Sequence, residues 1–376
     1  MSKFCLRFIL ITEVIIGGLA LAYIFSAFWH RPLGPVLQPS GQEVGSKHLS
    51  SSLPKLDVQN TLSQTVSVSP ASDLLDQIST ILNRPNKGLM PLCGGPSEMT
   101  LLVVGSDARE NGYLYGLADS IRIVRIDFTV PKVMLLDIPR DLWVDIPGIE
   151  DHYGITQGKL NQAYFFGNPG MGYYDGPGEG PGLLAQTLQL NYGIQVDHYL
   201  AMDRKTFVDI INAIGGIDVQ INSTIDMNEG QNGANPQWVM EVGDHHLDGD
   251  MALKLAMNRF PSIFQRARNQ NIVLRSLQEK LLHPAIIADL PNLVTRFVDS
   301  VQTDLSPSDF NQLICIAQKS AQKNTEIVAF PEEMFVPGST YDPYRQVNTY
   351  TLSVDNSLIR DYMADFMMGT WPDNPD

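Results

Sequence analysis

The chain has 376 residues, of which 44% are hydrophobic, and its formal net charge at pH 7 is −15. This length is enough for a membrane anchor, a linker and one large domain or two modest ones. The acidic balance disfavours nucleic acid as a partner, because that binding needs a basic surface. Any polyanion must therefore be bound by a local group of cations and not by the overall field of the protein.

The first predicted element is an apolar segment over Phe8–Trp29, in which Glu13 is the only charged residue. As a helix this segment would be roughly 33 Å long, which is enough to cross a bilayer. Lys3 and Arg7 precede it and predict a cytoplasmic N-terminus. We predict that residues 1–30 are a cytoplasmic stub and an uncleaved signal anchor, with a cleaved signal peptide as the alternative. The protein would then be a single-pass protein of the cell membrane, with its large C-terminal domain extracytoplasmic.

Residues 31–95 are rich in proline and serine and are predicted to be an extracytoplasmic linker. Beyond the anchor the chain has two cysteines, Cys93 and Cys315. A disulfide between them and two unpaired buried thiols both fit the sequence. No cysteine or histidine spacing predicts a zinc site.

Residues 96–376 are predicted to form the main domain with a C-terminal extension, and they contain a mixture of predicted strands and helices. Apolar runs bounded by polar turns predict strands over 100–104, 121–128, 132–138, 198–202, 217–221 and 325–330. Helical periodicity predicts helices over 183–192, 204–214, 250–260, 262–282, 307–319 and 356–368. Strands 121–128 and 132–138 are predicted to form a hairpin. We expect an α/β fold, a three-layer α/β/α sandwich with a mixed central sheet.

Acidic and arginine residues lie next to the ends of three of these strands. Asp107 follows the first strand, Asp119 precedes the second and Arg140 follows the third. Open α/β sheets bind ligands at strand ends. Two carboxylates with arginines suit a Mg²⁺ ion that bridges a phosphate or pyrophosphate. Each acid taken alone is more typical of an ordinary turn.

Two further patterns are not assigned to this site. Residues 167–182 contain seven glycines and three prolines. They lack the Gly-Lys-Ser/Thr of a P-loop and are predicted to be a flexible loop, a candidate lid over an acceptor site. His245 and His246 lack a third ligand at a suitable spacing, so they are predicted to lie in a polar turn before a helix.

Six ordered motifs over residues 98–283 resemble the LytR-CpsA-Psr family of cell-envelope proteins. They are Gly105-Ser106-Asp107-Ala108-Arg109, Ala118-Asp119-Ser120, Ile138-Pro139-Arg140-Asp141, Lys159 to Tyr164, Ile214 to Val219, and Leu247 to Leu253. The resemblance implies an α/β/α sandwich and an enzyme, a phosphotransferase that moves a glycopolymer phosphate from a polyprenyl-pyrophosphate carrier to peptidoglycan. It therefore implies two partners, the polyprenyl-pyrophosphate-linked glycan and peptidoglycan.

The resemblance also implies roles for individual residues. Asp107 and Asp119 match the acids that associate with Mg²⁺, and Asp107 is the predicted general base. Arg140 matches a phosphate-binding arginine and is predicted to take part in catalysis. The predicted substrate-binding residues are Arg109, Arg140, Arg259, Arg266 and Gln270.

The chain departs from the family pattern at three positions. Met257 stands where an arginine is expected, Ile263 where an aspartate is expected, and Asn269 where another arginine is expected. Fewer cations stabilise a charged transition state less well. The alternative function is therefore that of a degenerate, non-catalytic protein of the same fold, which binds polyprenyl phosphate or a wall glycan.

Overall fold

A computed structural model of the chain describes residues 28–37, 90–108, 112–228, 235–260, 262–319 and 324–371. Residues 1–27 and 38–89, which hold most of the predicted anchor and linker, lie outside the described residues. Among the helices of the described ranges, none has both the length and the apolar composition needed to cross a bilayer.

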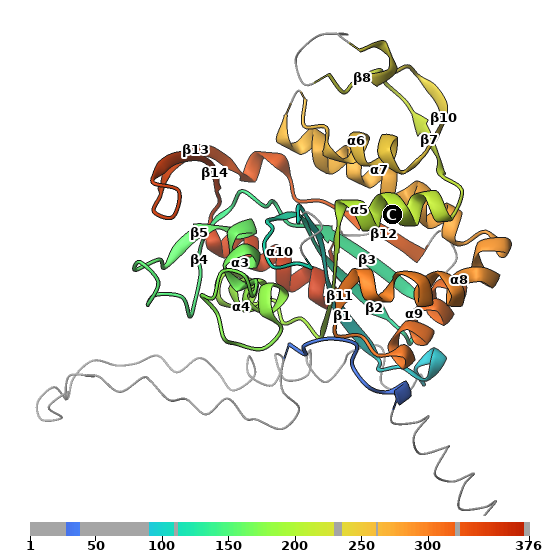
Figure 1. The fold of residues 1–376 in the computed structure, drawn as a ribbon, viewed down its shortest axis with the longest axis horizontal. Coiled ribbons are helices and arrows are strands. Elements are labelled where there is room, and N and C mark those ends of the chain that lie inside the picture. Colours follow the sequence, from blue (N-terminus) through green and yellow to red (C-terminus); the bar gives the residue numbers. More distant parts are fainter. Residues whose placement is uncertain are drawn as a thin grey trace, which may run out of the picture.

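A six-stranded mixed sheet forms the centre of the molecule (Figure 1). Its order is β11 (Val301–Thr303), β6 (His198–Asp203), β1 (Glu98–Ser106), β2 (Ala118–Asp127), β3 (Lys132–Asp137) and β12 (Thr325–Val328). Strand β1 pairs in parallel with β6 and antiparallel with β2, and β2 and β3 form the predicted hairpin. Because both edge strands come from residues beyond 300, the C-terminal part of the chain is integral to the sheet.

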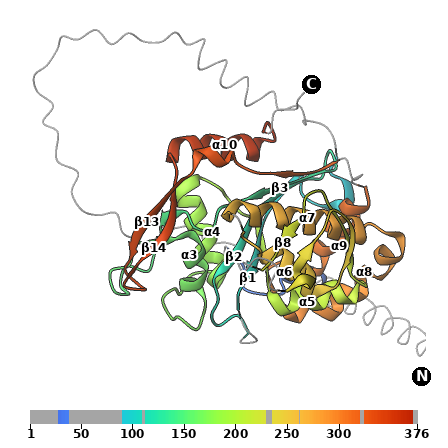
Figure 2. The same ribbon diagram turned by 90° about the horizontal axis from the view of Figure 1, so that it is seen from above.

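Helices α3 (Leu160–Gly167), α4 (Glu179–Tyr192) and α10 (Asn356–Met368) share one hydrophobic core with the sheet (Figure 2). Leu102 and Val104 of β1 and Ile121 of β2 are fully buried in this core. Successive side chains of a strand point to opposite faces, so the alternate residues of the same strands point to the other face of the sheet.

Two further units lie on the other face of the sheet. Helix α9 (Pro307–Lys319) contributes Ile316 to a core that contains Leu101 of β1 and Ile126 of β2. A separate lobe has its own core and stands beside the sheet in Figure 1. It comprises α5 (Arg204–Ala213), β7 (Ile217–Ile221), β8 (Ile225–Asp226), β9 (Val239–Met240), β10 (Gly243–Leu247), α6 (Gly249–Met257), α7 (Ile263–Leu281) and α8 (Pro284–Phe297). The chain therefore has the predicted mixed α/β fold with a central mixed sheet.

Two small hairpins extend from the α3 side of the molecule. They pair β4 (Trp143–Asp145) with β5 (Gln157–Lys159), and β13 (Val336–Asp342) with β14 (Val347–Ser353). The second hairpin is joined to the sheet region through Leu352, whose N–H donates to the Asp141 carbonyl at 2.8 Å.

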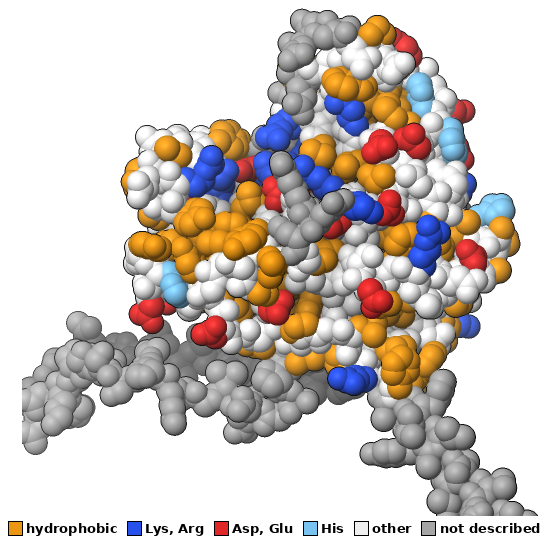
Figure 3. Space-filling model, viewed as in Figure 1, with side chains coloured by type: hydrophobic (Ala, Val, Ile, Leu, Met, Phe, Trp, Pro, Cys, Tyr) orange, Lys and Arg blue, Asp and Glu red, His pale blue; other side chains and the backbone are white. Residues whose placement is uncertain are grey.

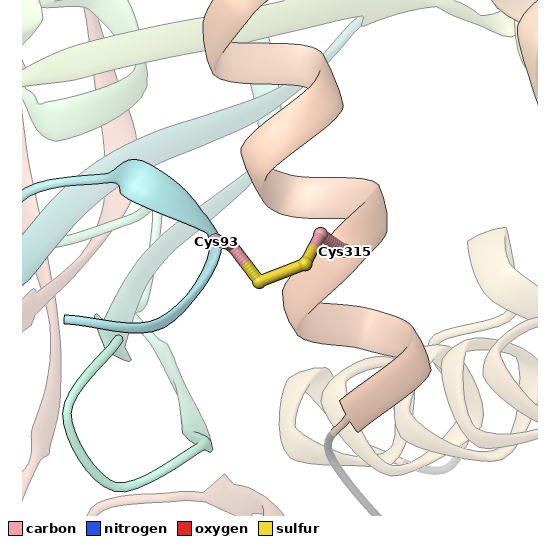
Figure 4. Close-up of a disulfide and its surroundings, with 2 residues drawn as sticks. All are labelled: Cys93 and Cys315. Atoms are coloured by element: carbon pink, nitrogen blue, oxygen red, sulfur yellow. A yellow bond between two sulfur atoms is a disulfide. The ribbon is translucent and has the colours of Figure 1, made fainter.

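The N-terminal part of the described chain is attached to the sheet at two places. Cys93 forms a disulfide with Cys315 of α9, with the two Cα atoms 5.9 Å apart (Figure 4). The structure thus selects the disulfide from the two alternatives left open by the sequence. Residues 28–37 also lie against the domain, because Leu33 N donates to Leu305 O at 3.2 Å and the Tyr199 hydroxyl donates to Pro35 O at 2.8 Å.

One local prediction is wrong. His245 and His246 do not lie in a turn, because β10 pairs antiparallel with β7 over its whole length. The strand is short and its outward side chains are polar, so the sequence lacks an apolar alternation. The predicted start of α7 is correct, since the Ser262 hydroxyl accepts a hydrogen bond from Gln265 N at 3.3 Å.

Candidate functional site

Three of the predicted site residues lie at one end of the strands of the central sheet. We call this end of the strands the site edge. Strands β1, β3 and β6 run in the same direction and β2 runs against them. The C-terminal ends of β1, β3 and β6 and the start of β2 therefore lie together. This arrangement places Asp107, Asp119 and Arg140 at the site edge, with Arg204 as the first residue of α5 after β6.

Asp119 owes its position to an irregularity in the β1–β2 pairing. Gly105 pairs with Ser120, whereas Ser106 pairs with Ala118, so Asp119 is the extra residue of a β-bulge. A bulge redirects a side chain and is common beside functional sites.

The Asp119 carboxylate contacts three guanidinium groups. Oδ1 accepts a hydrogen bond from Arg140 Nη1, and Oδ2 lies 2.6 Å from Arg204 Nη2 and 3.4 Å from Arg266 Nη2. Arg266 Nη2 also donates to the Asp119 carbonyl at 3.0 Å. Burial alone would raise the pKa of Asp119, but the three arginines outweigh it and hold this pKa below its usual range.

Arg140 is held from a second side by Asp141. Its Nε lies 3.4 Å from Asp141 Oδ2, and Lys159 Nζ lies 2.8 Å from Asp141 Oδ1. Lys159 is the residue that precedes α3. Arg140 is thus fixed between two carboxylates, and Lys159 adds a second cation at the same place.

A second charged pair lies beneath this group. Arg122 of β2, which is 3% exposed, points Nη2 toward Asp137 Oδ1 of β3 at 3.5 Å and donates to Gln270 Oε1 at 3.4 Å. The Ser120 hydroxyl donates to the same Gln270 oxygen at 3.2 Å. Burial raises the pKa of Asp137, and Arg122 and Arg266 oppose this shift. Gln270 therefore links α7 to the sheet at the site.

Two adjoining cavities open at the site edge, and Asp119, Ser120, Arg266 and Gln270 line both of them. The first, the charged pocket, has a volume of about 240 Å³. The second, the apolar cavity, has a volume of about 170 Å³ and lies between the sheet and helices α5, α6 and α7. The charged pocket is lined in addition by Ile121, Asp137, Ile138, Pro139, Arg140, Asp141, Lys159, Arg259, Phe264, Ala267, Tyr350 and Leu352.

Basic side chains outnumber acidic ones around the two cavities, with six Lys or Arg residues against four Asp residues. Figure 3 shows Lys and Arg side chains gathered near the centre of this face. Arg259 is exposed and has no acidic partner within the part of the chain that the structure describes. The Nε atom of Arg266 and the Nε and Nη1 atoms of Arg122 are buried without a hydrogen-bond partner among the described residues. Arginines with unused donors suit a phosphate group, which accepts paired hydrogen bonds.

Asp107 differs from the other predicted residues because it lines neither cavity. Its Oδ1 accepts a hydrogen bond from Leu117 N at 2.5 Å, and its own N–H donates to the Leu117 carbonyl. These bonds close the loop between β1 and β2. Its role as a base or metal ligand stays a prediction. Arg109 lies outside the described residues, so its predicted role stays a prediction too.

The three departures from the family pattern occupy different places. Met257 lines the apolar cavity. Asn269 is fully buried away from solvent, where its Nδ2 donates to the Asn258 carbonyl at 3.1 Å and so joins α7 to the end of α6. Ile263 is the first residue of α7.

Three basic residues of the site were not predicted from the sequence: Arg122, Lys159 and Arg204. Arg204 begins a helix directly after β6, so its position at a strand end was the available signal. Arg122 lies between Ile121 and Ile123 of β2, where a charge is unusual without a partner.

The model of the LytR_cpsA_psr family matches residues 84–359. The chain belongs to the LytR_cpsA_psr family. The resemblance found in the sequence motifs is therefore confirmed.

Two proteins, MsrR and TagU, are similar to this chain over much of its length. The regulatory protein MsrR of Staphylococcus aureus is 26% identical over 276 residues, which cover 72% of this chain and 74% of MsrR. The polyisoprenyl-teichoic acid–peptidoglycan teichoic acid transferase TagU of Enterococcus faecalis is 25% identical, and the match covers 64% of this chain and 73% of TagU.

Solved structures share the fold at lower sequence identity. Bacillus subtilis TagV matches with a TM-score of 0.54 and 22% identity, covering 73% of this chain and 98% of TagV. The gbs0355 protein of Streptococcus agalactiae matches with a TM-score of 0.56 and 19% identity, covering 73% and 88% of the two chains. At these identities the likeness establishes the fold alone.

Proposed function

We propose that this protein is a membrane-anchored transferase that moves a glycopolymer phosphate from a polyprenyl-pyrophosphate carrier to peptidoglycan. The observation that carries this proposal is the sharing of Asp119, Ser120, Arg266 and Gln270 by a cation-rich pocket and an apolar cavity. A polyprenyl-pyrophosphate carrier is likewise divided into a charged diphosphate head and an apolar hydrocarbon tail. At about 170 Å³, the apolar cavity is smaller than a typical pocket of roughly 300 Å³ or more, so it takes only the part of a long tail next to the head.

The family relationship supports the transferase class, because TagU is named as a polyisoprenyl-teichoic acid–peptidoglycan teichoic acid transferase. The predicted anchor would keep the domain beside lipid-linked donors on the outer side of the membrane. Residues 31–37, which follow the predicted anchor, lie against the domain through Leu33 and Pro35.

In the proposed reaction, a hydroxyl oxygen of peptidoglycan attacks the phosphorus that carries the glycopolymer. A new P–O bond forms, the P–O bond to the lipid-side phosphate breaks, and polyprenyl phosphate leaves. Arg140, Arg259 and Arg266 bind the phosphate oxygens and stabilise the charge of the transition state. The hydroxyl proton passes to a carboxylate, for which Asp107 is our candidate.

We further propose that Mg²⁺ assists this reaction through Asp107 and Asp119, whose carboxylates offer the hard oxygen ligands that Mg²⁺ prefers. The described residues hold no group of three or more His, Cys, Asp or Glu able to bind a metal, so donor phosphate oxygens must complete the proposed site. Because three arginines hold Asp119, they would have to pass to the phosphates before Asp119 could serve as a ligand. When bound, Mg²⁺ would supply positive charge to the diphosphate.

A non-catalytic binding protein is the second candidate, and one observation favours it. The acids of the charged pocket, Asp119, Asp137 and Asp141, each lie within 3.5 Å of a Lys or Arg nitrogen. Each of these three carboxylates is already paired with a cation, so none of them is free to act as a general base. Under this alternative the protein holds polyprenyl phosphate or a wall glycan without transfer.

Turnover of a lipid-linked glycopolymer donor, with and without Mg²⁺, tests the proposal. We expect the Arg140→Ala and Asp107→Ala variants to lose at least 100-fold in rate. Arg268→Ala is the matched control, because Arg268 lies on the same helix as Arg266 but is exposed and pairs with Glu332. Wild-type turnover in both test variants would reject the transferase assignment. An inactive wild type that still retains polyprenyl phosphate would support the binding alternative.

A further inference from the structure

A continuous group of aromatic rings joins α3 to the loops around it. The ring of Tyr173 stacks on His152 with centroids 4.4 Å apart and on Phe166 at 5.9 Å, and it contacts Tyr153 at 6.4 Å. Tyr344 contacts Phe166 edge-on at 5.2 Å. We call these five residues the aromatic platform. In the space-filling view, hydrophobic side chains gather beside the central Lys and Arg side chains (Figure 3).

The platform has a buried base and exposed outer rings. Phe166 of α3 is 1% exposed, whereas Tyr153 is 86% and Tyr344 is 39% exposed. Large exposed aromatic side chains that cluster in this way mark interaction sites more often than isolated ones do. A tyrosine ring combines a flat apolar face with a polar hydroxyl, so it suits a ligand that is both apolar and hydrogen-bonding.

A buried carboxylate holds the backbone of the turn that carries Tyr344. Asp342, which is 1% exposed, accepts hydrogen bonds from Tyr344 N and Arg345 N at 3.0 Å each and from Gln162 Nε2 at 2.8 Å. Gln162 belongs to α3, so the β13–β14 turn is fixed to the helix that carries Phe166. A binding surface whose rings are already held in place loses less entropy when it binds.

The charge around the platform disfavours a polyanion. Three exposed acidic residues, Glu150, Asp151 and Asp175, lie within two residues of a platform tyrosine or histidine in the sequence, against the single exposed basic residue Arg345. The cation-rich pocket, by contrast, already accounts for the anionic donor. A ligand of the platform is therefore expected to be largely uncharged along its length.

The platform and the charged pocket share two elements of the fold, α3 and the β13–β14 hairpin. Helix α3 begins after Lys159, which lines the pocket, and reaches Phe166 after seven residues, or about 10 Å at 1.5 Å per residue. Strand β14 carries Tyr350, which lines the same pocket, and the turn before it carries Tyr344. A short run of sugar rings covers this distance.

We propose that the aromatic platform binds the sugar backbone of the acceptor glycan strand and presents its hydroxyl group to the charged pocket. This inference rests on the transferase function proposed above and adds to it a second substrate site. Each face of a pyranose ring that carries C–H bonds can pack on a tyrosine ring, while the sugar hydroxyls bond to water or to the tyrosine hydroxyl. The glycine-rich loop predicted to cover an acceptor site supplies Tyr173.

Calorimetric titration with tetra-N-acetylchitotetraose, an uncharged N-acetylglucosamine oligomer, tests the platform without any need for turnover. We expect the wild type to bind it and the Tyr153→Ser/Tyr344→Ser double variant to bind at least tenfold more weakly. Trp238→Ser is the matched control, because Trp238 is an exposed aromatic residue of the separate lobe and packs against Lys254. This variant should bind like the wild type.

The same preparations separate the two proposals. Co-purified polyprenyl phosphate, measured by mass spectrometry, reports on the donor site and should be equal in all variants. If the oligosaccharide fails to bind while the donor lipid is retained, the platform proposal is overturned and the donor site stands. Equal oligosaccharide affinity in the double variant, or tighter platform binding of poly(glycerol phosphate), would also overturn it. Oligosaccharide binding without any lipid or transfer would support the platform and reject the proposed transferase.

Discussion

The two ends of the central strands use acidic residues in different ways. At the end opposite the site edge, Asp197 Oδ2 accepts a hydrogen bond from Thr100 N at 2.7 Å, and Asp304 Oδ1 accepts one from Tyr199 N at 2.8 Å. These carboxylates fix the backbone. At the site edge, Asp119 contacts three guanidinium groups instead. Carboxylates at one end of the sheet thus accept backbone hydrogen bonds, and the carboxylate at the other end gathers cations.

The residues at the end opposite the site edge stabilise the fold, whereas those at the site edge are suited to bind a ligand. A buried donor without a partner costs about 1–3 kcal/mol, and Arg266 Nε and two nitrogens of Arg122 are such donors at the site edge among the described residues. Burial, together with the charges of Arg140 and Arg259, lowers the pKa of Arg266, although Asp119 opposes this shift. A site edge of this kind is stabilised by an incoming anion, so its substitutions should affect activity more than stability.

The largest expected effect is the loss of activity in an Arg266→Met variant. We expect turnover of the lipid-linked donor to fall about 1,000-fold, or ~4 kcal/mol, because a buried arginine would no longer neutralise the phosphates. The free energy of unfolding should change by less than about 1 kcal/mol, since repulsion from Arg140 and Arg259 is relieved. Denaturant unfolding and steady-state kinetics provide the two measurements, with Arg268→Met as the control on the same helix. A variant that loses stability and activity in parallel would contradict the distinction between the two edges.

The reverse pattern is expected for the Cys93→Ser/Cys315→Ser variant. The disulfide closes a loop across a sequence separation of 222 residues, and its loss should lower the free energy of unfolding by about 4 kcal/mol through the entropy of the unfolded chain. Turnover below the unfolding transition should remain within about twofold of wild type, because neither cysteine lines the charged pocket. Chemical denaturation of the oxidised wild type and the variant measures this effect. An unchanged midpoint would show that the bond adds no stability.

The Asp304→Ala variant tests how much one carboxylate at the end opposite the site edge contributes to stability. Asp304 is 3% exposed, and its removal leaves the buried Tyr199 N–H without its acceptor. We expect unfolding to become easier by about 2 kcal/mol, with donor turnover preserved. Hydrogen exchange at the Tyr199 amide gives a local measurement, which should rise in the variant. If this amide stays protected, the carboxylate is not what holds it.

The sequence predicted the fold well where one segment determines its own structure. The helices over 307–319 and 356–368 and the strand over 217–221 have the predicted bounds. Their apolar spacing and end residues lie within the segment. Strand β10 was missed because its pairing with β7 depends on a partner some 25 residues away and its polar side chains give no periodic signal.

The candidate site was predicted in part for the same reason. Asp119 and Arg140 lie at strand ends that the sequence itself marks, and the structure joins them directly. The contribution of Arg204 follows only from the parallel pairing of β6 with β1, which no local pattern specifies. Asp107 belongs to a family motif, but its carboxylate closes the β1–β2 loop. A motif gives the order of residues and does not give the direction in which a side chain points.

The smallest expected effect concerns His198, which lies at the end opposite the site edge. Its Nδ1 is 3.5 Å from Asp304 Oδ2. Asp304, with support from Asp309 and Asp197, raises the pKa of His198 above its usual value, although burial opposes this shift. The surrounding surface also carries His30. Because the folded-state pKa is raised, protonated His198 stabilises the fold fully below the unfolded-state pKa of about 6.5. That contribution is lost as the pH rises through the folded-state value.

We therefore expect the difference in unfolding free energy between wild type and His198→Gln to be largest near pH 5.5 and to shrink toward zero by about pH 9. Denaturant titrations at several pH values measure it, and subtraction of the variant removes the contribution of the other histidines. The Asp304→Ala background should weaken the pH dependence, since it removes the main partner and leaves only Asp309 and Asp197 to raise the pKa of His198. A wild-type minus variant difference that is constant with pH would show that the carboxylates here act on the backbone alone. The contrast with the site edge would then be one of backbone hydrogen bonding, with no part played by side-chain charge.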